Sequence, residues 1–406
     1  MSFVERSGKR TWRVRYWRDD GTHGSISGFP TRKAAEAKAR EIDTDRGRGD
    51  FLDPHAGRIT LDTWIITWFD ALDVSPATTS QYRSITRNHI RPRWGTTPLG
   101  DISGIAVAAW AKKLRAEGYA AATVATILKI FSMMLADAAD ERLIPANPIR
   151  PRRRGRRRHE PVTEPVWATP AQALAVAVNA ARLAGPTAGI LLLTAAWTGA
   201  RWGELTGLHR DNLTLTSDGV GRIVIDPHVG ALHEVDTMLY LGPPKTAESA
   251  RPITLPPFLV EVLRHHLSTH PHPHVFVNAD GSFLRRSNFA RRAMRPAADG
   301  TTIRAQPPVA AAPAAPGLTF HGLRHSHKTW LIADQIPEVA QARRLGHRIP
   351  DKIQHIYSHV APELEARVLD TLQRRWTTAL AALAAPNWSA AVASTHALPA
   401  ARRRPA

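Results

Sequence analysis

The sequence predicts a mainly α-helical protein with small β-sheets, of the α+β class, built as three domains. Most of the chain shows apolar residues at helical spacing, and alternating strand-like segments are confined to the N-terminus and to residues 221–255. We expect domains at residues 1–55, 58–148 and 164–385, joined by a basic linker (149–163) and followed by a disordered tail (386–406).

The charge and the cysteine content narrow the function classes. The 406 residues include 54 Lys+Arg and 35 Asp+Glu, a formal net charge of +19, which predicts a polyanionic partner, nucleic acid first. With no cysteine, disulfides, a thiolate nucleophile and a cysteine zinc site are excluded. There is no signal-type h-region and no run of about 18 apolar residues, so we expect a soluble, intracellular protein.

The first domain is expected to be a three-stranded sheet followed by a helix. In "TWRVRYW" the residues alternate, so Val14 and Tyr16 face one way while Arg13 and Arg15 face the other. Thr31 can cap a helix rich in Ala, Lys and Glu. An arginine-bearing sheet face could read DNA, or the arginines could simply be solvated; these residues leave both readings open.

The second domain is predicted to be helical. Its first helix carries apolar residues at positions i, i+3, i+4 and i+7, namely Leu61, Trp64, Ile65 and Trp68. Ser75-Pro76 opens a second helix, and helices at about 105–116 and 122–139 follow. The segment "IPANP" ends the last one.

The linker "IRPRRRGRRRHEP" has no apolar periodicity. A block of like charge is disordered unless it is neutralised, so the linker could be a solvated tether or could lie along DNA and contact its phosphates. The number of positive charges favours contact with DNA phosphates. Its expected DNA contacts are Arg152, Arg153, Arg154, Arg156, Arg157 and Arg158.

The third domain begins near residue 164, with helices at about 170–183 and 188–197, a hairpin region at 221–255 and further helices to about 385. The Ala/Pro-rich segment 296–317 is expected to be a mobile loop.

Two stretches early in this domain carry candidate functional groups. In "TGARWGEL" a turn would project Arg201 from the start of a helix, with Glu204 three positions on. In "PPKTAESARPITLP" Lys245 is expected at a hairpin turn. Alone, the first pair could be an ordinary helical ion pair, and the lysine an exposed turn residue.

Two later stretches add histidines, an arginine and a tyrosine. "HGLRHSH" places His321 and Arg324 three apart, on one helical face. "LGHRIPDKIQHIYSHV" places Tyr357 ten residues after His347. Each of these could be a core or capping residue when taken singly.

Together these groups are what cleavage of a phosphodiester by a tyrosine would need. Guanidinium groups can clamp the non-bridging oxygens, on which charge accumulates during phosphoryl transfer. A tyrosine of pKa about 10 costs about 4 kcal/mol to ionise at pH 7, so it needs a positive site and a base. Histidine can act as that base, and lysine can protonate the leaving oxygen.

The four stretches resemble the conserved boxes of the tyrosine site-specific recombinases of the phage and integrative-element integrase family. The resemblance covers nearly the whole chain and implies an N-terminal arm-site DNA-binding domain, a helical core-site-binding domain and a catalytic domain. The catalytic set it implies is Tyr357 as nucleophile, Arg201 and Arg324 as phosphate clamp, Lys245 as leaving-group acid, and His321 and His347 as proton-transfer and phosphate-binding groups.

The resemblance also implies the partners. These are double-stranded DNA at core and arm attachment sites, a homotetramer on DNA, an excisionase and a DNA-bending host factor, in the cytoplasm of a bacterium and at the nucleoid when bound. No cofactor, no metal and no membrane are implied. The chain departs from the family where Arg348 and Ile349 replace the usual small hydroxyl residues, and segment 296–317 looks like an insertion. A direct role for His325 is left open.

Four other functions fit part of the sequence. A chromosome-dimer or plasmid resolvase of the same family usually lacks the N-terminal sheet, and a type IB topoisomerase lacks the two-domain DNA-binding front end. A DNA-binding regulator without chemistry would be expected to have lost part of the catalytic set. A metal-dependent phosphoesterase is suggested by "HPHPH" (270–274), but no carboxylate lies within that segment to complete a hard-metal site.

Overall fold

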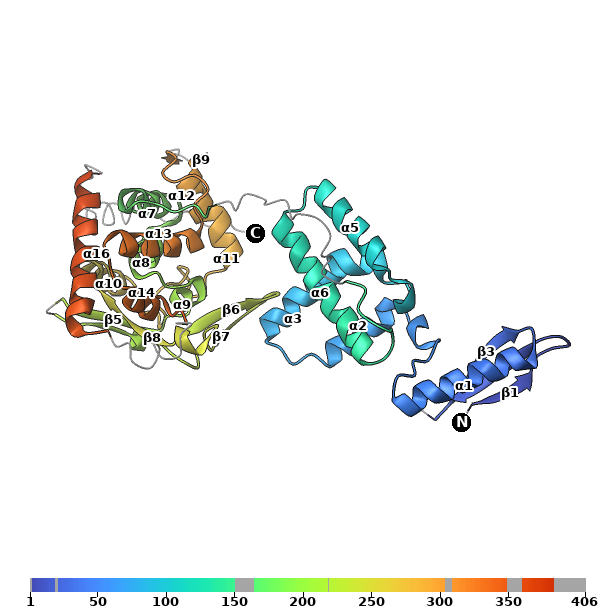
Figure 1. Ribbon diagram of the computed structural model, residues 1–406. Helices are drawn as coiled ribbons and strands as arrows, with labels where there is room; N and C mark the ends of the chain where they lie inside the picture. Colours follow the sequence, from blue (N-terminus) through green and yellow to red (C-terminus); the bar gives the residue numbers. More distant parts are fainter. Residues whose placement is uncertain are drawn as a thin grey trace. The chain divides into compact units, whose positions relative to one another are not determined.

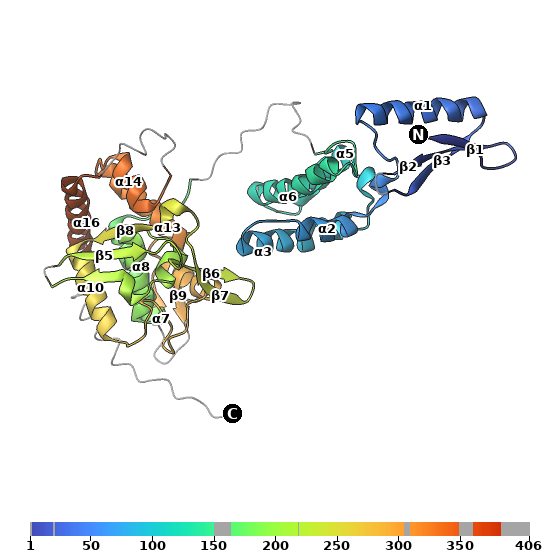
Figure 2. The ribbon, with the colours of Figure 1, turned by 90° about the horizontal axis from the view of Figure 1, so that it is seen from below.

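The structure is a computed structural model that describes residues 2–18, 21–149, 164–217, 219–303, 309–348 and 360–382 (Figures 1 and 2). The chain divides into two compact units, Met1–His159 and Glu160–Ala406. Both are mainly helical with small antiparallel sheets, which confirms the predicted fold class.

The first unit begins with a three-stranded antiparallel sheet packed on one helix (Figure 1). Its elements are β1 (Phe3–Arg6), β2 (Trp12–Trp17), β3 (His23–Phe29) and α1 (Arg32–Arg48). The helix begins at Thr31, whose hydroxyl accepts a hydrogen bond from the backbone N–H of Ala34. Val14 and Tyr16 are fully buried in the cluster that α1 covers, so the predicted alternation along β2 is confirmed.

The rest of the first unit is helical. Its elements are α2 (Leu61–Asp70), α3 (Pro76–Ile85), α4 (Arg91–Trp94), α5 (Gly104–Ala116) and α6 (Ala121–Asp140), with a π-helical turn (Thr86–Ile90) between α3 and α4. Thr60 and Ser75 cap α2 and α3, and the helix start predicted at Ser75-Pro76 is confirmed. Trp94 and Phe131 are central to a core separate from that of the sheet.

Helix α6 is, among the described residues, long and apolar enough to cross a membrane. Its apolar residues are nevertheless part of a protein core, because Val124, Ile127, Phe131 and Leu135 are fully buried among the other helices of this unit. Length and hydropathy alone therefore do not make α6 a membrane span.

The second unit is built around α8 (Pro186–Thr198), in which every residue from Ala188 to Thr198 is buried. Around it lie α7 (Pro170–Ala184), α9 (Trp202–Thr206), α10 (Pro257–Ser268), α11 (Arg286–Phe289), α12 (Arg295–Asp299), α13 (Phe320–Ala333), α14 (Glu338–Leu345) and α16 (Pro362–Ala382). A helix that is apolar all round is expected at the centre of a domain rather than at its surface.

Among the residues that the structure describes, three small antiparallel sheets complete this unit. The first has the order β4-β5-β8 and consists of β4 (Leu213–Leu215), β5 (Gly221–Ile225) and β8 (Arg251–Leu255). The second is a hairpin of β6 (Ala231–Val235) and β7 (Met238–Gly242), which projects from the body of the unit in Figures 1 and 2. The third pairs β9 (Thr301–Ile303) with β10 (Val309–Ala311).

The prediction of a mobile loop at residues 296–317 is wrong for the part that the structure describes. This segment contains most of α12 and both strands of the third sheet. Ala297, Ala298 and Ala315 are buried in the core, and the Asn179 side-chain amide donates to the carbonyls of Ala297 and Ala312 at 3.0 Å each. Alanine is small enough to bury completely, so its abundance here reflects packing rather than mobility.

Helix α16 packs on its own unit. Val368, Leu372 and Trp376 are buried, and the Trp376 ring stacks on Phe258 with centroids 4.2 Å apart. Arg375 donates two hydrogen bonds to the Asp334 carboxylate, at 2.6 and 2.8 Å. The last described helix is therefore part of the core of this unit.

Candidate active site

Arg201 lies at the start of α9, directly after a turn made by Gly199. Gly199 has φ 66°, and a Cβ there would come within 2.6 Å of the Leu345 side chain, so both backbone and space require glycine. The Arg201 side chain is 25% exposed and donates to Glu204 Oε1 at 2.7 Å. The predicted turn, helix start and ion pair are all present.

Two further contacts connect Arg201 with distant segments. Its Nη1 donates to Ser249 Oγ at 2.8 Å, and its Nη2 donates to the carbonyl of Gly346 at 3.3 Å. Arg201 therefore joins α9 to the loop before β8 and to the C-terminal end of α14.

Glu204 is a buried carboxylate shared by two arginines. It is 2% exposed, and it accepts from the backbone N–H of Arg201 at 2.9 Å and from Arg251 at 3.0 and 3.2 Å. Burial alone would raise the pKa of Glu204, but the charges and hydrogen bonds of Arg251 and Arg201 lower it below its ordinary value. Glu204 is therefore ionised and neutralises part of the charge of the two guanidinium groups.

Arg324 lies on α13 and is 5% exposed. It donates from Nη1 to the carbonyl of Gly199 at 2.7 Å and from Nη2 to the carbonyl of Leu345 at 2.5 Å. Burial, and then the charges of Arg201 and Arg251, lower the pKa of Arg324 to about 9, so it is still a cation at neutral pH. Arg324 and Arg201 thus bind adjacent carbonyls at the end of α14, and the structure brings the two predicted clamp residues together.

His321 and His325 lie one turn apart at the exposed side of α13, with ring centroids 4.9 Å apart. Partial burial, and then the charges of His325, Arg324 and Arg286, lower the pKa of His321. His321 is therefore neutral at neutral pH and has a ring nitrogen free of a proton.

His347 follows α14 immediately. Gly346, in the left-handed conformation with φ 63°, ends the helix before it. Partial burial, and then the charges of Arg324, Lys328 and Arg201, lower the pKa of His347 to about 4. Both histidines predicted for the site thus lie close to its cationic groups and are uncharged at neutral pH.

Lys245 does not lie at a hairpin turn, so that prediction is wrong. Strand β7 pairs with β6, and their turn is at residues 236–237, whereas β8 pairs with β5. Lys245 is exposed, in the connection between the two sheets. Pro243 and Pro244 lack the N–H groups that a further strand pairing would use, which explains why β7 ends before the lysine.

Arg344 is a further buried arginine, in the last turn of α14, and its hydrogen bonds hold this helix end in place. Arg344 is 8% exposed, and it donates to His327 Nε2, to the carbonyl of Trp197 and to the carbonyl of Thr254, each at 3.0 Å. Because His327 Nε2 accepts, its proton is on Nδ1, which donates to the carbonyl of Ala196 at 2.9 Å. Burial holds the pKa of His327 well below its usual value, so this ring is neutral.

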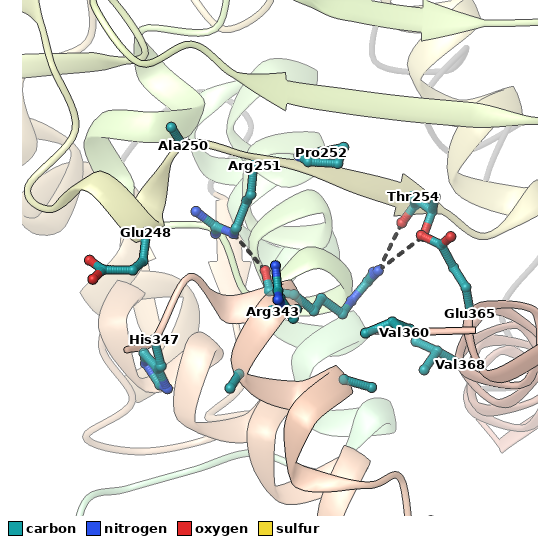
Figure 3. Close-up of a pocket in the computed structure, with 13 residues that line it drawn as sticks. Glu248, Ala250, Arg251, Pro252, Thr254, Arg343, His347, Val360, Glu365 and Val368 are labelled. Atoms are coloured by element: carbon teal, nitrogen blue, oxygen red, sulfur yellow. Dashed lines mark hydrogen bonds between the residues drawn. The ribbon is translucent and has the colours of Figure 1, made fainter. Parts of the chain in front are cut away.

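A cavity of about 410 Å³ lies between β8 and α14, and Arg251 and His347 line it (Figure 3), together with Arg344. Val360 lines the same cavity, and it is three residues after Tyr357 in the sequence. Tyr357 itself lies outside the described residues.

The sequence does not predict a role for Arg251, Arg344, His327 or Ser249, and it predicts Glu204 only as the partner in a helical ion pair. One signal was available for Arg251. It shares a strand face with Ile253 and Leu255, which are both 1% exposed, and a charged residue on a core-facing strand position needs partners.

The residues predicted to contact DNA are placed only in part. Arg13 and Arg15 lie on the sheet face opposite Val14 and Tyr16, and both approach Glu5 Oε1, at 2.5 and 3.6 Å. The six linker arginines lie outside the described residues, as does the tail from residue 386 onward.

The histidine-rich segment 270–274 has a structural explanation. Arg210 donates to the backbone carbonyls of Leu267, His270 and His272. In the part of the chain that the structure describes, no group of three or more His, Cys, Asp or Glu side chains could hold a metal ion.

Comparison with known proteins places these observations in a family. Residues 171–363 match the model of the phage integrase family. The putative prophage phiRv2 integrase of Mycobacterium tuberculosis is 27% identical over 292 residues, 69% of each chain. The family match covers the stretches that contain the first arginine, the lysine, the histidine–arginine box and the tyrosine.

Two solved structures share the fold. The Tn1549 transposon integrase in complex with a circular intermediate DNA has a TM-score of 0.56 at 16% identity, covering 77% of this chain and 99% of that one. A lambda integrase tetramer bound to a Holliday junction has a TM-score of 0.50 at 18% identity, covering 86% and 98%.

The family match and the integrase relatives indicate an enzyme of phosphoryl transfer. These matches support a site-specific tyrosine recombinase of the phage integrase family. The predicted family and enzyme class are confirmed.

Proposed function

We propose that this recombinase integrates or excises a phage or mobile element by cutting and rejoining DNA through a 3′-phosphotyrosine at Tyr357. The observation that carries the proposal is the convergence of Arg201 and Arg324 on the adjacent carbonyls of Gly346 and Leu345, directly before His347. Residues 201, 324 and 347 are far apart in sequence, so a shared anchoring point is difficult to explain as local packing.

The guanidinium groups have donors left for a phosphate. Glu204, Ser249 and Gly346 take three hydrogen bonds from Arg201, and Gly199 and Leu345 take two from Arg324. An arginine has five N–H donors, so in the described part of the site both keep donors for non-bridging phosphate oxygens.

In the proposed reaction the phenolic oxygen of Tyr357 attacks the scissile phosphorus and the bond to the 5′-oxygen breaks. The phenolic proton passes to His321 or His347, whose lowered pKa values keep them neutral and able to accept it. Lys245 gives a proton to the departing 5′-oxygen. The phosphodiester energy is kept in the phosphotyrosine, so attack by another 5′-hydroxyl reverses the step and joins a new strand.

The DNA-binding roles are proposed for the remaining parts of the chain. We assign arm sites to residues 1–55 with Arg13 and Arg15, core sites to 58–148, and phosphate contacts to the linker 149–163. The N-terminal sheet favours an integrase over a resolvase of the same family.

The assembly and the setting are proposed in the same way. The shared fold with a lambda integrase tetramer bound to a Holliday junction supports a homotetramer on DNA. An excisionase, a DNA-bending host factor and a cytoplasmic location, at the nucleoid when DNA is bound, complete the proposal.

The test is covalent trapping on a nicked core-site DNA that loses its leaving strand after cleavage. We expect the wild-type chain to form a covalent protein–DNA species in EDTA, because the two arginines supply the charge stabilisation that a metal supplies elsewhere. Tyr357→Phe deletes only the nucleophilic oxygen, so it should bind this DNA normally and trap none. Trapping by Tyr357→Phe, or a requirement of the wild type for added metal, would contradict the proposal.

A further inference from the structure

Arg251, at the first position of β8, is a buried cation outside the predicted catalytic set. It is 7% exposed, and its guanidinium donates four hydrogen bonds. Nε donates to the carbonyl of Arg344 at 2.6 Å, Nη1 to the carbonyl of Ser249 at 2.6 Å and to Glu204 Oε1 at 3.2 Å, and Nη2 to Glu204 Oε2 at 3.0 Å. Figure 3 shows Arg251 extending from its strand toward the end of α14.

These four bonds reach three segments that each carry a proposed catalytic residue. Glu204 belongs to α9, which directly follows Arg201. Ser249 belongs to the connection that contains Lys245, and Arg344 lies three residues before His347. One planar guanidinium therefore fixes the backbone or side chain of all three segments at once.

Arg201 depends on the same groups. It binds Glu204 Oε1, Ser249 Oγ and the carbonyl of Gly346. Arg251 holds the first two residues directly, and it also holds the segment just before Gly346. The close approach is visible at Gly346, where a Cβ would come within 2.9 Å of Arg251 Nη1.

We propose that Arg251, with Ser249 as its link to Arg201, is a positioning residue for strand cleavage. It sets Arg201, the Lys245 connection and His347 relative to one another without touching DNA. The inference rests on the proposed function, because it assigns Arg251 to the cleavage step of that site.

Lysine cannot replace this arrangement. Its ammonium is a single point of charge, whereas the bonds of Arg251 leave from Nε and from both terminal nitrogens in one plane. Arg251→Lys keeps the positive charge but removes the planar guanidinium. Its effect therefore reports the hydrogen-bond geometry of Arg251 and not its charge.

The test compares DNA binding with the rate of covalent trapping on the nicked DNA at saturating protein. For Arg251→Lys we expect trapping about 10²-fold slower, the cost of misplacing reacting groups by about 1 Å. The Kd for the same DNA should change by less than about threefold. The matched control is Arg210→Lys, which also removes guanidinium–carbonyl bonds but lies outside the site. It should trap within about threefold of the wild-type rate.

A second variant covers the case in which Arg251→Lys does not fold. Ser249→Ala removes one acceptor of Arg201 with little change in volume. It should slow trapping about 10-fold at unchanged Kd, the equivalent of one charge-assisted hydrogen bond. The proposed function is tested separately, by covalent trapping in the wild type and its absence in Tyr357→Phe. If that test succeeds, wild-type trapping rates in both Arg251→Lys and Ser249→Ala would overturn the positioning role and leave the proposed function standing. Losses of equal size in DNA affinity (Kd) and in trapping rate would do the same.

Discussion

Replacing Glu204 by glutamine tests whether one buried carboxylate balances the arginines of the active site. Each carboxylate oxygen accepts from two donors, Oε1 from Arg201 Nη1 and Arg251 Nη1, and Oε2 from Arg201 N–H and Arg251 Nη2. A glutamine places an NH₂ group against one of these donor pairs and removes the negative charge. Breaking a buried charge pair on one side costs about 3–5 kcal/mol, so we expect Glu204→Gln to destabilise the second unit by about that amount.

Native-state hydrogen exchange on peptides from α8 measures this loss, because that helix is buried throughout and exchanges only when the unit opens. The matched control is Glu234→Gln. Glu234 is 27% exposed and lies 3.6 Å from Arg285, so its replacement should cost less than about 1 kcal/mol. A loss below about 1 kcal/mol for Glu204→Gln as well would refute the idea that this carboxylate compensates the site's cations.

Two further predictions concern pH and DNA. The buried His266, whose pKa is lowered to about 4, and His327 are neutral in the fold, so the unfolded chain binds more protons below pH 6.5. Stability should be complete above about pH 6.5 and fall as pH drops, by roughly 1 kcal/mol at pH 5.5 for His266 and in the same direction for His327. Urea unfolding that is flat from pH 7.5 to 5.5 would contradict this. Replacing the six linker arginines by serine should weaken binding about equally for every DNA sequence, and a shallower salt dependence in anisotropy titrations should accompany it. A change confined to one base position would show that the linker reads bases.

The elements that the sequence predicts well are those specified by neighbouring residues. Thr31, Thr60 and Ser75 each cap a helix through a hydroxyl that accepts from the N–H three residues on. The alternation along β2 fixed which side chains are buried, since a strand has only two faces. The turn before Arg201 was predictable for the same reason, because its glycine and the helix that follows are adjacent in sequence.

The parts that could not be predicted depend on contacts between distant segments. Nothing near Arg251 in the sequence indicates that its partners are Glu204 and the carbonyl of Arg344, 47 and 93 residues away. The prediction for Lys245 is wrong because strand pairing depends on contacts between segments that are distant in sequence. Strand β7 pairs with the strand before it, β6, and not with the strand after it, β8. The family resemblance identified the catalytic set, but it contained no information on the residues that support it.

The supporting residues explain how a site of this charge can exist before DNA binds. Arg201, Arg251 and Arg324 lie close enough for the charges of the first two to lower the pKa of the third, and Glu204 offsets only part of that repulsion. The backbone supplies the rest, because the carbonyls of Arg344, Leu345 and Gly346 each accept from one of the three guanidinium groups. These consecutive carbonyls belong to the C-terminal end of α14, where the helix dipole is negative and four carbonyls lack helical partners. The fold thus uses a helix end to hold cations in place while leaving them a net positive charge. A phosphodiester that enters the site can then be bound by groups that need no rearrangement, which is the condition for electrostatic catalysis.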